Sequence, residues 1–337
     1  MVTILIPTAK RPHLLANALR SVSEQTAANE IVEVIVSENA GDSRSREVCK
    51  QFPGLPIKYI FRDPQMLPTE HGSTLAKTPW SGEFTAILHD DDWWTPDFLS
   101  RGIEALNSHP KSSVFCCSSY YVANEEDIFL RLSPILYFWF GANYPRIGPV
   151  WEMGMQEVLL ASLLATPAHY STIMTKAEAF RNSALIYDTG NGFDNDRMLI
   201  FELSKHGTLL YSPLPQAFYR LHAQQETTSH SEDGKTMQMC RTTEWMLDRS
   251  GETWESLGNL FYERAGNCPK DVRNHLHYLA LQPWSLPILV KHLNKSSDVV
   301  GFYKQIRAKT RFKALIKPFC PPIILNKGKF LRNFFGM

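Results

Sequence analysis

Short apolar runs alternate with helical patterns along the first part of the chain. The apolar runs predict four buried strands, over Val2–Ile6, Ile31–Val36, Ile57–Phe61 and Phe84–Leu88. Apolar residues at helical spacing predict helices over about Pro12–Gln25 and Ser43–Gln51, and another that starts near Pro96. Strands that alternate with crossover helices predict an α/β fold with a doubly wound, mainly parallel sheet flanked by helices.

After about residue 124 the pattern is less regular. Ser133–Met155 is rich in aromatic residues, glycine and proline, and is interpreted as an irregular or helical insertion. Asp194–His206 has the apolar spacing of a helix, and Gly207 is its predicted C-cap. Gln224–Lys235 is polar and is predicted to be a mobile loop, and helices are expected from about Thr236.

Polar segments follow three of the predicted strands. These segments are Pro7–Arg11, Ser37–Ser43 and His89–Trp94. Ligands of doubly wound sheets bind beyond the carboxyl ends of the strands. The three segments are therefore expected to meet at one edge of the sheet and to form a site.

Three consecutive carboxylates, Asp90–Asp92, stand at this predicted edge. Neighbouring like charges raise one another's pKa, and a hard divalent cation such as Mg²⁺ or Mn²⁺ removes that penalty. The alternative is a solvated turn that caps the next helix, with Thr95 as N-cap and Pro96 at the first helical position. Because the capping alternative accounts for Thr95 and not for the aspartates, a metal–diphosphate site is favoured.

Five segments carry a resemblance to a known family. They are Val2–Pro12, Ile35–Ser43, Ser81–Asp92, Asn195–Gly207 and Tyr219–His222. In this order they resemble the opening Pro-Thr strand, the acidic second-strand segment, the Gly-Glu strand with its DxD motif, the Glu-Asp-x-x-Leu helix and the Tyr-Arg-x-His segment of family 2 glycosyltransferases. The resemblance spans about residues 1–225. It implies a GT-A fold and an enzyme of the kind that builds bacterial surface polysaccharides.

The resemblance also implies a division of the chain. Residues 1–225 would form the GT-A catalytic domain, with a nucleotide-sugar half over about 1–124 and an acceptor half over about 125–225. Residues 226–337 would form a helical extension with a basic amphipathic tail.

For the donor, the resemblance implies roles for five residues. Pro7, Thr8 and Arg11 would line the nucleotide pocket. Glu38 would accept a hydrogen bond from the base, typically from N3–H of uracil, and Asp90 would face the ribose or the sugar.

For the chemistry, the resemblance implies a metal site and a base. Asp91 and Asp92 would hold Mn²⁺ or Mg²⁺, with His222 as a further ligand, and Asp196 would be the catalytic base. The dipole of the predicted helix favours an ionised Asp196, as a base requires. Asp194 is the competing base, N-capping by Asp194 or Asn195 is the structural alternative, and a lone histidine such as His222 is often structural.

The chain departs from the family pattern at three places. His89 replaces an aspartate often found at the start of the DxD segment, and Glu38 is one methylene longer than the usual aspartate. The usual basic residue and asparagine before the Gly-Glu strand are absent, and His71 or Lys77 is the candidate substitute.

Composition adds little to the fold but changes the view of the C-terminus. The net charge is +1, yet residues 302–337 contain nine basic and no acidic residues, so the body of the chain is acidic. Large apolar residues alternate with these lysines and arginines, which is typical of a membrane-surface element that binds anionic lipid. The alternatives are a helix docked on the protein and, less favoured, nucleic-acid binding without a recognition motif.

Targeting and cysteine patterns indicate a cytoplasmic protein. The chain begins with an apolar strand pattern and shows no secretory leader, and no stretch reaches the roughly 18 apolar residues of a spanning helix. The six cysteines form no CxxC pair, so reduced, mostly buried thiols are expected and a zinc site is not. With the basic tail, the expected location is the inner face of the cell membrane.

The resulting hypothesis is a metal-dependent, inverting glycosyltransferase. It would move a sugar from a nucleotide donor, UDP-sugar favoured, to a hydroxyl of a glycan or lipid-linked glycan in surface-polysaccharide synthesis. One alternative is a sugar nucleotidyltransferase, against which the absence of glycine in Pro7–Arg11 counts. The other is an inactive GT-A domain that serves as a membrane scaffold.

Overall fold

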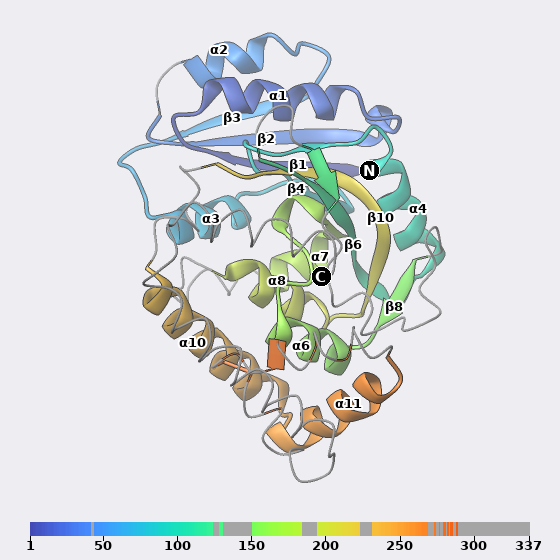
Figure 1. Ribbon diagram of the computed structural model, residues 1–337. Coiled ribbons are helices and arrows are strands. Elements are labelled where there is room, and N and C mark those ends of the chain that lie inside the picture. The colour runs from blue at the N-terminus through green and yellow to red at the C-terminus, as the bar shows by residue number, and fades with distance from the viewer. Residues whose placement is uncertain are drawn as a thin grey trace.

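The computed structural model describes residues 1–41, 44–123, 128–130, 150–183, 194–222 and 231–268, with eight further positions between 273 and 288. These residues form an α/β body around a ten-stranded sheet (Figure 1). Residues 133–149 of the predicted insertion Ser133–Met155, most of the polar segment before residue 231 and the basic tail lie outside the described residues.

The first four strands of the sheet are the predicted ones. They are β1 (Val2–Thr8), β2 (Ile31–Asn39), β3 (Ile57–Arg62) and β4 (Phe84–Ile87). They pair in parallel in the order β3-β2-β1-β4. Register places Thr8 opposite Glu38 and Leu5 opposite Ile87, so the carboxyl ends of β1, β2 and β4 lie side by side.

The second part of the sheet is mixed. Its strands are β5 (Trp93–Trp94), β6 (Ser112–Val122), β7 (Ile128–Leu130), β8 (Trp151–Met153), β9 (Ile173–Lys176) and β10 (Thr208–Arg220). β9 runs antiparallel to both β4 and β6, while β6 and β10 are parallel to each other. The predicted parallel pairing therefore holds for the first four strands of the sheet. β9, which lies between β4 and β6, runs in the opposite direction to both. β8 is a strand at a place that the sequence analysis assigned to an irregular or helical insertion.

Helices cover both faces of the sheet. One face packs on α1 (Pro12–Ser23) and α4 (Phe98–Ser108), and α2 (Arg44–Lys50) lies beside α1. The other face packs on α3 (Pro68–Ala76), α7 (Ala177–Ser183) and α8 (Asn195–Leu203). Short 3₁₀ turns, η1 (Ala28–Glu30) and η3 (Tyr170–Thr172), lead into β2 and β9. Alternate residues of β1 serve the two faces, with Ile4 on one side and Leu5 on the other.

The helix after the aspartates starts later than predicted. β5 follows the aspartates directly, and α4 begins at Phe98 with Asp97 in the N-cap position. Thr95 is not the N-cap; its hydroxyl donates to the carboxylate of Asp97 at 2.6 Å. The capping alternative for the aspartate run is therefore wrong.

Gly207 does not cap the helix that the sequence predicted over Asp194–His206. α8 ends at Leu203, and Ser204 is its C-cap. A Cβ at Gly207 would lie 2.4 Å from the carbonyl oxygen of Lys111 and 2.9 Å from the backbone nitrogen of Ser113. This glycine is needed for close approach of two backbones where β10 enters the sheet.

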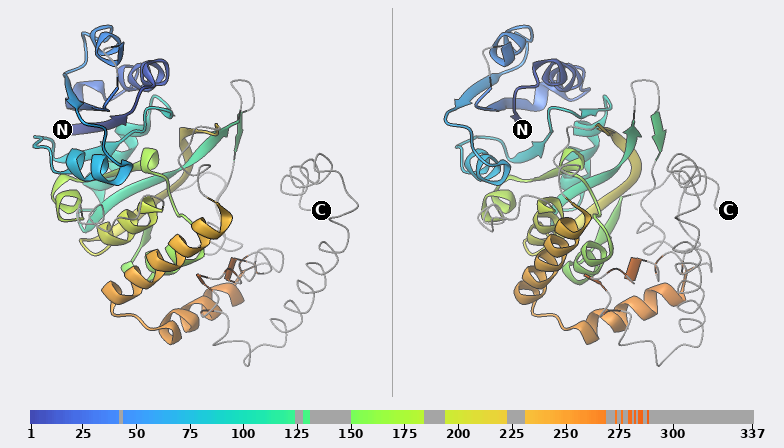
Figure 2. Two further views of the ribbon diagram at one scale, coloured as in Figure 1. Left: turned by 90° about the vertical axis from the view of Figure 1, so that its left-hand side faces the viewer. Right: turned by 60° about the vertical axis from the view of Figure 1, so that its left-hand side comes forward.

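The C-terminal helices continue the body of the molecule. α10 (Glu232–Ser250) and α11 (Trp254–Gly266) lie on the side of α6 (Met155–Leu164) and α8 that faces away from α1 and α2 (Figures 1 and 2). A third apolar cluster joins all four helices. It includes Leu163, Phe201, Met246 and Phe261, all buried. α10 begins inside the segment that the sequence predicted to be a mobile loop, because Ser231 caps it by accepting from the Gly234 N–H.

Two further sequence expectations concern membranes and thiols. No helix in the described part of the chain is long and apolar enough to cross a membrane. The described cysteines are free thiols, and four of them, Cys49, Cys116, Cys117 and Cys268, are buried.

Candidate functional site

The polar segments after β1, β2 and β4 meet at one edge of the sheet, as predicted. The Thr8 hydroxyl donates to Asp90 Oδ2 at 2.7 Å, and the Lys10 N–H donates to Glu38 Oε1 at 2.8 Å. Lys10 has a φ of 59°, so the chain turns sharply just beyond β1. Pro7 is half-buried at the end of β1, opposite Ser37 in register.

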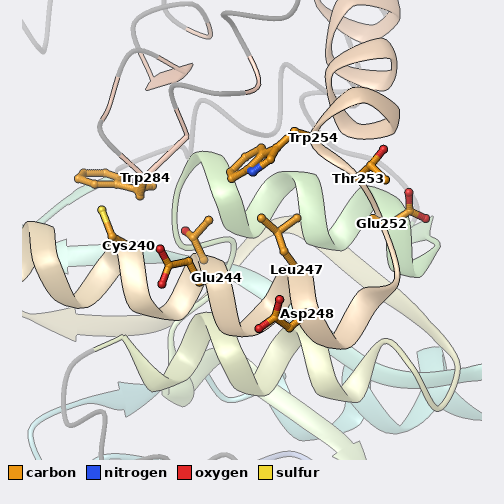
Figure 3. A pocket seen from close by; sticks show the side chains of 9 residues that line it. Cys240, Glu244, Leu247, Asp248, Glu252, Thr253, Trp254 and Trp284 are labelled. Atoms are coloured by element: carbon orange, nitrogen blue, oxygen red, sulfur yellow. The ribbon is translucent and has the colours of Figure 1, made fainter.

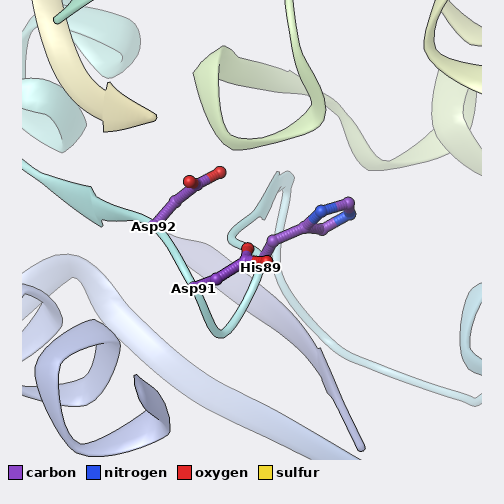
Figure 4. Close-up of side chains that lie close together, drawn as sticks. All are labelled: His89, Asp91 and Asp92. Carbon is purple, nitrogen blue, oxygen red and sulfur yellow. The ribbon is translucent and has the colours of Figure 1, made fainter. Parts of the chain in front are cut away.

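The three aspartates project from a tight turn. The Asp92 N–H donates to the His89 carbonyl oxygen at 3.1 Å, which closes the turn (Figure 4). The ligand atoms of His89, Asp91 and Asp92 all lie within 4.8 Å of one another. His89, which the sequence analysis noted only as a departure, is thus part of the cluster.

Asp90 is fully buried and anchors the turn to β1. Besides the Thr8 hydroxyl, it is paired with Arg11, whose Nη2 lies 2.7 Å from Asp90 Oδ1 and whose Nε donates to Oδ2 at 3.1 Å. Burial raises the pKa of Asp90 to about 7, although Arg11 and Thr8 act to lower that pKa.

Asp92 is also buried and joins the turn to the second half of the sheet. Its Oδ2 accepts from the Ser171 hydroxyl at 2.6 Å, and its Oδ1 accepts from the Arg220 N–H at 3.0 Å. Burial raises the pKa of Asp92 well above its usual range, with Asp91 adding to the effect. Both carboxylate oxygens of this predicted metal ligand therefore accept hydrogen bonds within the protein.

Asp91 is the most accessible carboxylate of the run. Its Oδ2 lies 2.9 Å from Arg11 Nη1 and 3.0 Å from His222 Nε2, and its side chain is 11% exposed. Burial acts to raise the pKa of Asp91, but His89, Arg11 and His222 together hold it below its usual range. Asp91 is therefore ionised at neutral pH, and the predicted partner His222 contacts it.

The donor set at this turn fits a divalent cation. Carboxylate oxygens suit Mg²⁺ and Mn²⁺, and the Asp91 carboxylate already holds one positive group, the guanidinium of Arg11. Burial lowers the pKa of His89, so its imidazole is neutral and able to ligate. His89, Asp91 and Asp92 are the side chains grouped closely enough to hold such an ion, and His222 contacts Asp91 beside them. Within this group the oxygens of Asp92 already accept from Ser171 and Arg220.

Glu38 lies in a closed environment at the end of β2. The residue is fully buried, and its carboxylate packs against Gly41, where a Cβ would lie 1.7 Å from Oε1. Oε1 accepts from Lys10, and Oε2 has no hydrogen-bond partner among the described residues. A buried, half-satisfied carboxylate is suited to accept a ligand's N–H.

His71 and Lys77 are the candidate substitutes for the family's basic residue before the Gly-Glu strand. Burial lowers the pKa of His71 to about 4, with a smaller effect from Arg62, so His71 is neutral at pH 7. Its Nε2 lies 2.8 Å from the Ser37 hydroxyl, which also accepts from Arg62 Nε at 3.3 Å. Lys77 is exposed at the C-cap of α3. Arg62, which the sequence analysis did not select, is the cation that reaches this network.

A second acidic group lies at the start of α8. Asp194 occupies the N-cap position with a φ of 80°, yet its side chain makes no capping hydrogen bond. Its carboxylate instead lies 2.6 Å from Nη1 of the fully buried Arg197. Burial raises the pKa of Asp194 to about 6 despite Arg197. The capping alternative is therefore wrong for Asp194, whose contact is with a buried cation.

Asp196 is more open than Asp194. Its side chain is 20% exposed, Oδ1 accepts from the Arg197 N–H at 2.9 Å, and Oδ2 lies 3.8 Å from Nδ1 of His169. His169 belongs to the short segment whose Ser171 donates to Asp92 in the aspartate turn. The predicted base and the aspartate turn therefore face the same region of the molecule.

Sequence reasoning missed several residues that complete this region. Tyr121, His169 and Ser171 come from β6, from the segment before β9 and from η3. Tyr219, from β10, lies in the Tyr219–His222 segment but was given no role. His169 and Ser171 belong to a short polar stretch between a helix and a strand, where no periodic pattern marks them. That polar stretch was the only available signal.

A separate cavity lies in the C-terminal helices. It has a volume of about 490 Å³ and is lined by α10 and its connection to α11, with Trp254 and Trp284 on its wall (Figure 3). The described residues that line it include none of the predicted site residues.

Comparison with known proteins agrees with this geometry. Residues 3–157 match the model of glycosyl transferase family 2. Glycosyltransferase GlyA of Streptococcus pneumoniae is 20% identical over 126 residues, which are 37% of this chain and 18% of GlyA. A Haemophilus influenzae glycosyltransferase of uncharacterised function is 20% identical over 236 residues, 69% of each chain. The chain thus spans less than a fifth of GlyA.

Two solved structures share the fold. One is S. aureus TarS in complex with UDP-GlcNAc, with 12% identity, a TM-score of 0.54 and coverage of 86% of this chain and 90% of that one. The other is mannosyltransferase PcManGT from Pyrobaculum calidifontis in complex with GDP-Man and Mn²⁺, with 17% identity, a TM-score of 0.54 and coverage of 94% and 81%. The match of residues 3–157 to glycosyl transferase family 2 and the shared fold together support a glycosyltransferase with a GT-A fold.

Proposed function

We propose that this glycosyltransferase is metal-dependent and inverting, and that it moves a sugar from a nucleotide donor to a hydroxyl of a glycan or lipid-linked glycan. The observation that carries the proposal is that one short segment contacts both acidic groups: Ser171 donates to Asp92 in the aspartate turn, and His169 Nδ1 lies 3.8 Å from Asp196. Asp91 would hold the cation beside the departing diphosphate, and Asp196 would serve the incoming hydroxyl.

The proposed donor pocket is built from the strand ends. Glu38 offers its unpartnered Oε2 to an N–H of the base, and uracil is favoured because its N3–H is such a donor. Pro7 and Thr8 form the wall at the end of β1, and Asp90 faces the ribose or sugar. Arg11, 25% exposed, lies on Asp90 and Asp91, where it also reaches the region of the diphosphate.

In the proposed reaction, Asp196 takes the proton of the acceptor hydroxyl. The acceptor oxygen forms a bond to the anomeric carbon from the face opposite the leaving group. The bond between that carbon and the diphosphate oxygen breaks, and the nucleoside diphosphate leaves with the electron pair. Configuration is inverted because the displacement occurs once, as the family resemblance implies.

Asp91 and His222, with His89 or Asp92, would hold Mn²⁺ or Mg²⁺. When bound, such an ion neutralises the charge that develops on the departing diphosphate. Support comes from the donor set at the turn and from the Mn²⁺ present in the structure of the mannosyltransferase.

The donor is tested by a screen of UDP-, GDP- and dTDP-sugars with Mn²⁺ and with EDTA, reading thermal shift and nucleotide release. We expect stabilisation and turnover with a UDP-sugar and Mn²⁺, and neither with EDTA. Turnover that is unchanged in EDTA would refute metal dependence, and exclusive response to another base would refute the preference for UDP.

The same assay separates the alternative functions. A sugar nucleotidyltransferase would join a nucleoside triphosphate to a sugar phosphate and release pyrophosphate. An inactive scaffold would show no metal-dependent turnover of any nucleotide sugar. We expect only the free nucleoside diphosphate and the transferred or hydrolysed sugar.

The acceptor and the location rest on the sequence of residues 302–337. The basic, apolar tail is proposed to bind anionic membrane on the cytoplasmic side and to bring the enzyme to a lipid-linked glycan in surface-polysaccharide synthesis. The full chain should bind vesicles that contain phosphatidylglycerol, and salt should weaken the binding. Equal binding after deletion of residues 302–337 would refute the role of the tail.

A further inference from the structure

A short segment before β9 contacts both acidic groups of the site. His169 faces Asp196, and Ser171, two residues along, donates to Asp92 and lies 3.1 Å from the His89 backbone nitrogen. The ring of Tyr170 packs against the ring of His89 at 5.1 Å. The segment therefore connects the aspartate turn to the start of α8.

His169 is held on several sides. Its Nε2 lies 2.5 Å from the Tyr121 hydroxyl, and its ring stacks on that of Tyr219 at 4.3 Å and 19°. Its backbone carbonyl accepts from both the N–H and the hydroxyl of Thr172, at 2.9 and 2.7 Å. A ring fixed in this way has little rotational freedom, so the direction of its remaining nitrogen is also fixed.

The remaining nitrogen, Nδ1, faces the carboxylate of Asp196 at 3.8 Å. A tyrosine hydroxyl is protonated at neutral pH and can donate to Nε2, which leaves the ring proton on Nδ1. An N–H on Nδ1 attracts the carboxylate, whereas a lone pair there would repel it. The contacts therefore favour one tautomer, with Tyr121 as donor to Nε2 and with N–H at Nδ1.

We propose that His169 is a positioning residue for Asp196, fixed in the Nδ1–H tautomer by Tyr121. It orients the carboxylate toward the acceptor hydroxyl. This inference rests on the proposed role of Asp196 as the base. It follows the general arrangement in which a catalytic group is oriented by a partner that is itself held by a third group.

Two substitutions separate positioning from simple packing. His169→Phe keeps a ring that can stack on Tyr219 but removes the N–H, whereas His169→Asn removes the ring but can place an amide N–H near the position of Nδ1. We expect His169→Phe to lower kcat about 10- to 100-fold with the donor KM unchanged, and His169→Asn to retain several-fold more activity than His169→Phe. The assay is nucleotide release from the donor that the wild type turns over, with water as acceptor.

Tyr121→Phe should also lower kcat, by a smaller factor than His169→Phe. Tyr120→Phe is its matched control, because Tyr120 lies on the opposite face of β6 and stacks on Phe218 instead. Packing alone would give the reverse order, with His169→Phe close to wild type and His169→Asn the weaker enzyme. That order would overturn the proposal.

A second measurement does not depend on turnover. In protein labelled with ¹⁵N-histidine, the His169 signals are identified by their loss in His169→Phe. We expect the Nδ1–H tautomer in the wild type, changed ring-nitrogen shifts in Tyr121→Phe and in Asp196→Asn, and no change in Tyr120→Phe.

An Nε2–H tautomer, or shifts that are insensitive to Asp196→Asn, would overturn the inference even if transfer is observed. Absence of turnover in the wild type with the expected tautomer would instead overturn the proposed function. The two failures are therefore distinguishable.

Discussion

The turn at residues 89–92 and the start of α8 each gather carboxylates, and in each the carboxylates divide into two kinds. Asp90, Asp92 and Asp194 are buried, and each contacts a cation or several hydrogen-bond donors of the protein. Asp91 and Asp196 are more exposed, and each is approached by a histidine, His222 and His169 respectively. Burial and partners, rather than position along the chain, divide these carboxylates into buried ones held by the protein and more exposed ones beside a histidine.

The two groups differ in what supports them. The aspartate turn is bound to strands and to η3, through Thr8, Ser171 and Arg220. The start of α8 is supported by helices. Arg197 donates to the Ser162 carbonyl oxygen of α6 and contacts the Thr243 hydroxyl of α10 at 3.4 Å. We infer that the candidate base depends on the C-terminal helices, although the sequence analysis placed a boundary near residue 225.

The largest expected effect separates the two aspartates of α8. Asp196→Ala should lower transfer by about 10²- to 10⁴-fold, the usual contribution of a general base, while the melting temperature stays near that of the wild type. The measurements are nucleotide release and thermal unfolding on the same preparation. Near-normal turnover by Asp196→Ala would remove this residue from the mechanism.

Asp194→Ala should act on stability. It leaves the guanidinium of Arg197, which is 0% exposed, without its counter-charge. Breaking a buried pair in this way costs about 3–5 kcal/mol, and urea unfolding measures it. An Asp194→Ala variant that unfolds like the wild type would contradict the division between the two kinds of carboxylate.

A pH-dependent effect should arise at His71, beside Ser37. The folded-state pKa of His71 is about 4, below its ordinary value, so the folded state binds fewer protons than the unfolded state between the two values. The contribution of His71 is therefore complete above pH 6.5 and is lost as the pH falls toward 4, by up to about 3 kcal/mol. His71→Gln should reduce the difference in unfolding free energy between pH 7.5 and 4.5. An unchanged difference would show that His71 is not buried in its neutral form.

The smallest expected effect concerns the entry of β10. Gly207→Ala should destabilise the protein by about 1–3 kcal/mol, because its Cβ would meet the backbone of Lys111 and Ser113. Gly54→Ala is the control, since a Cβ there meets nothing within 4 Å. Equal stability of the two variants would restore a simple capping role for Gly207.

Sequence patterns could predict one of these regions better than the other. The carboxyl ends of β1, β2 and β4 meet because parallel strands share an edge, so the contacts of Thr8 and Glu38 follow from topology. The mixed half could not be derived in this way. Nothing in its periodicity indicates that β9 reverses direction or that Ser171 reaches Asp92.

The buried ion pair between Arg197 and Asp194 could not be predicted from the sequence either. An arginine in a helix is normally expected to face solvent, so the sequence could not show that Arg197 is buried and takes Asp194 as its partner. His169 escaped notice because its partners Tyr121, Asp196 and Tyr219 come from three separate elements. Such contacts depend on the folded chain and not on local spacing.

The central claim is that Asp91 serves the donor and Asp196 serves the acceptor, and one paired measurement tests it. Donor binding in the presence of Mn²⁺ is measured by calorimetry, and turnover by nucleotide release, for the wild type, Asp91→Ala and Asp196→Ala. We predict that Asp91→Ala loses both Mn²⁺-dependent binding and turnover, whereas Asp196→Ala loses turnover but binds the donor like the wild type. Normal donor binding by Asp91→Ala, or lost binding by Asp196→Ala, would contradict the account.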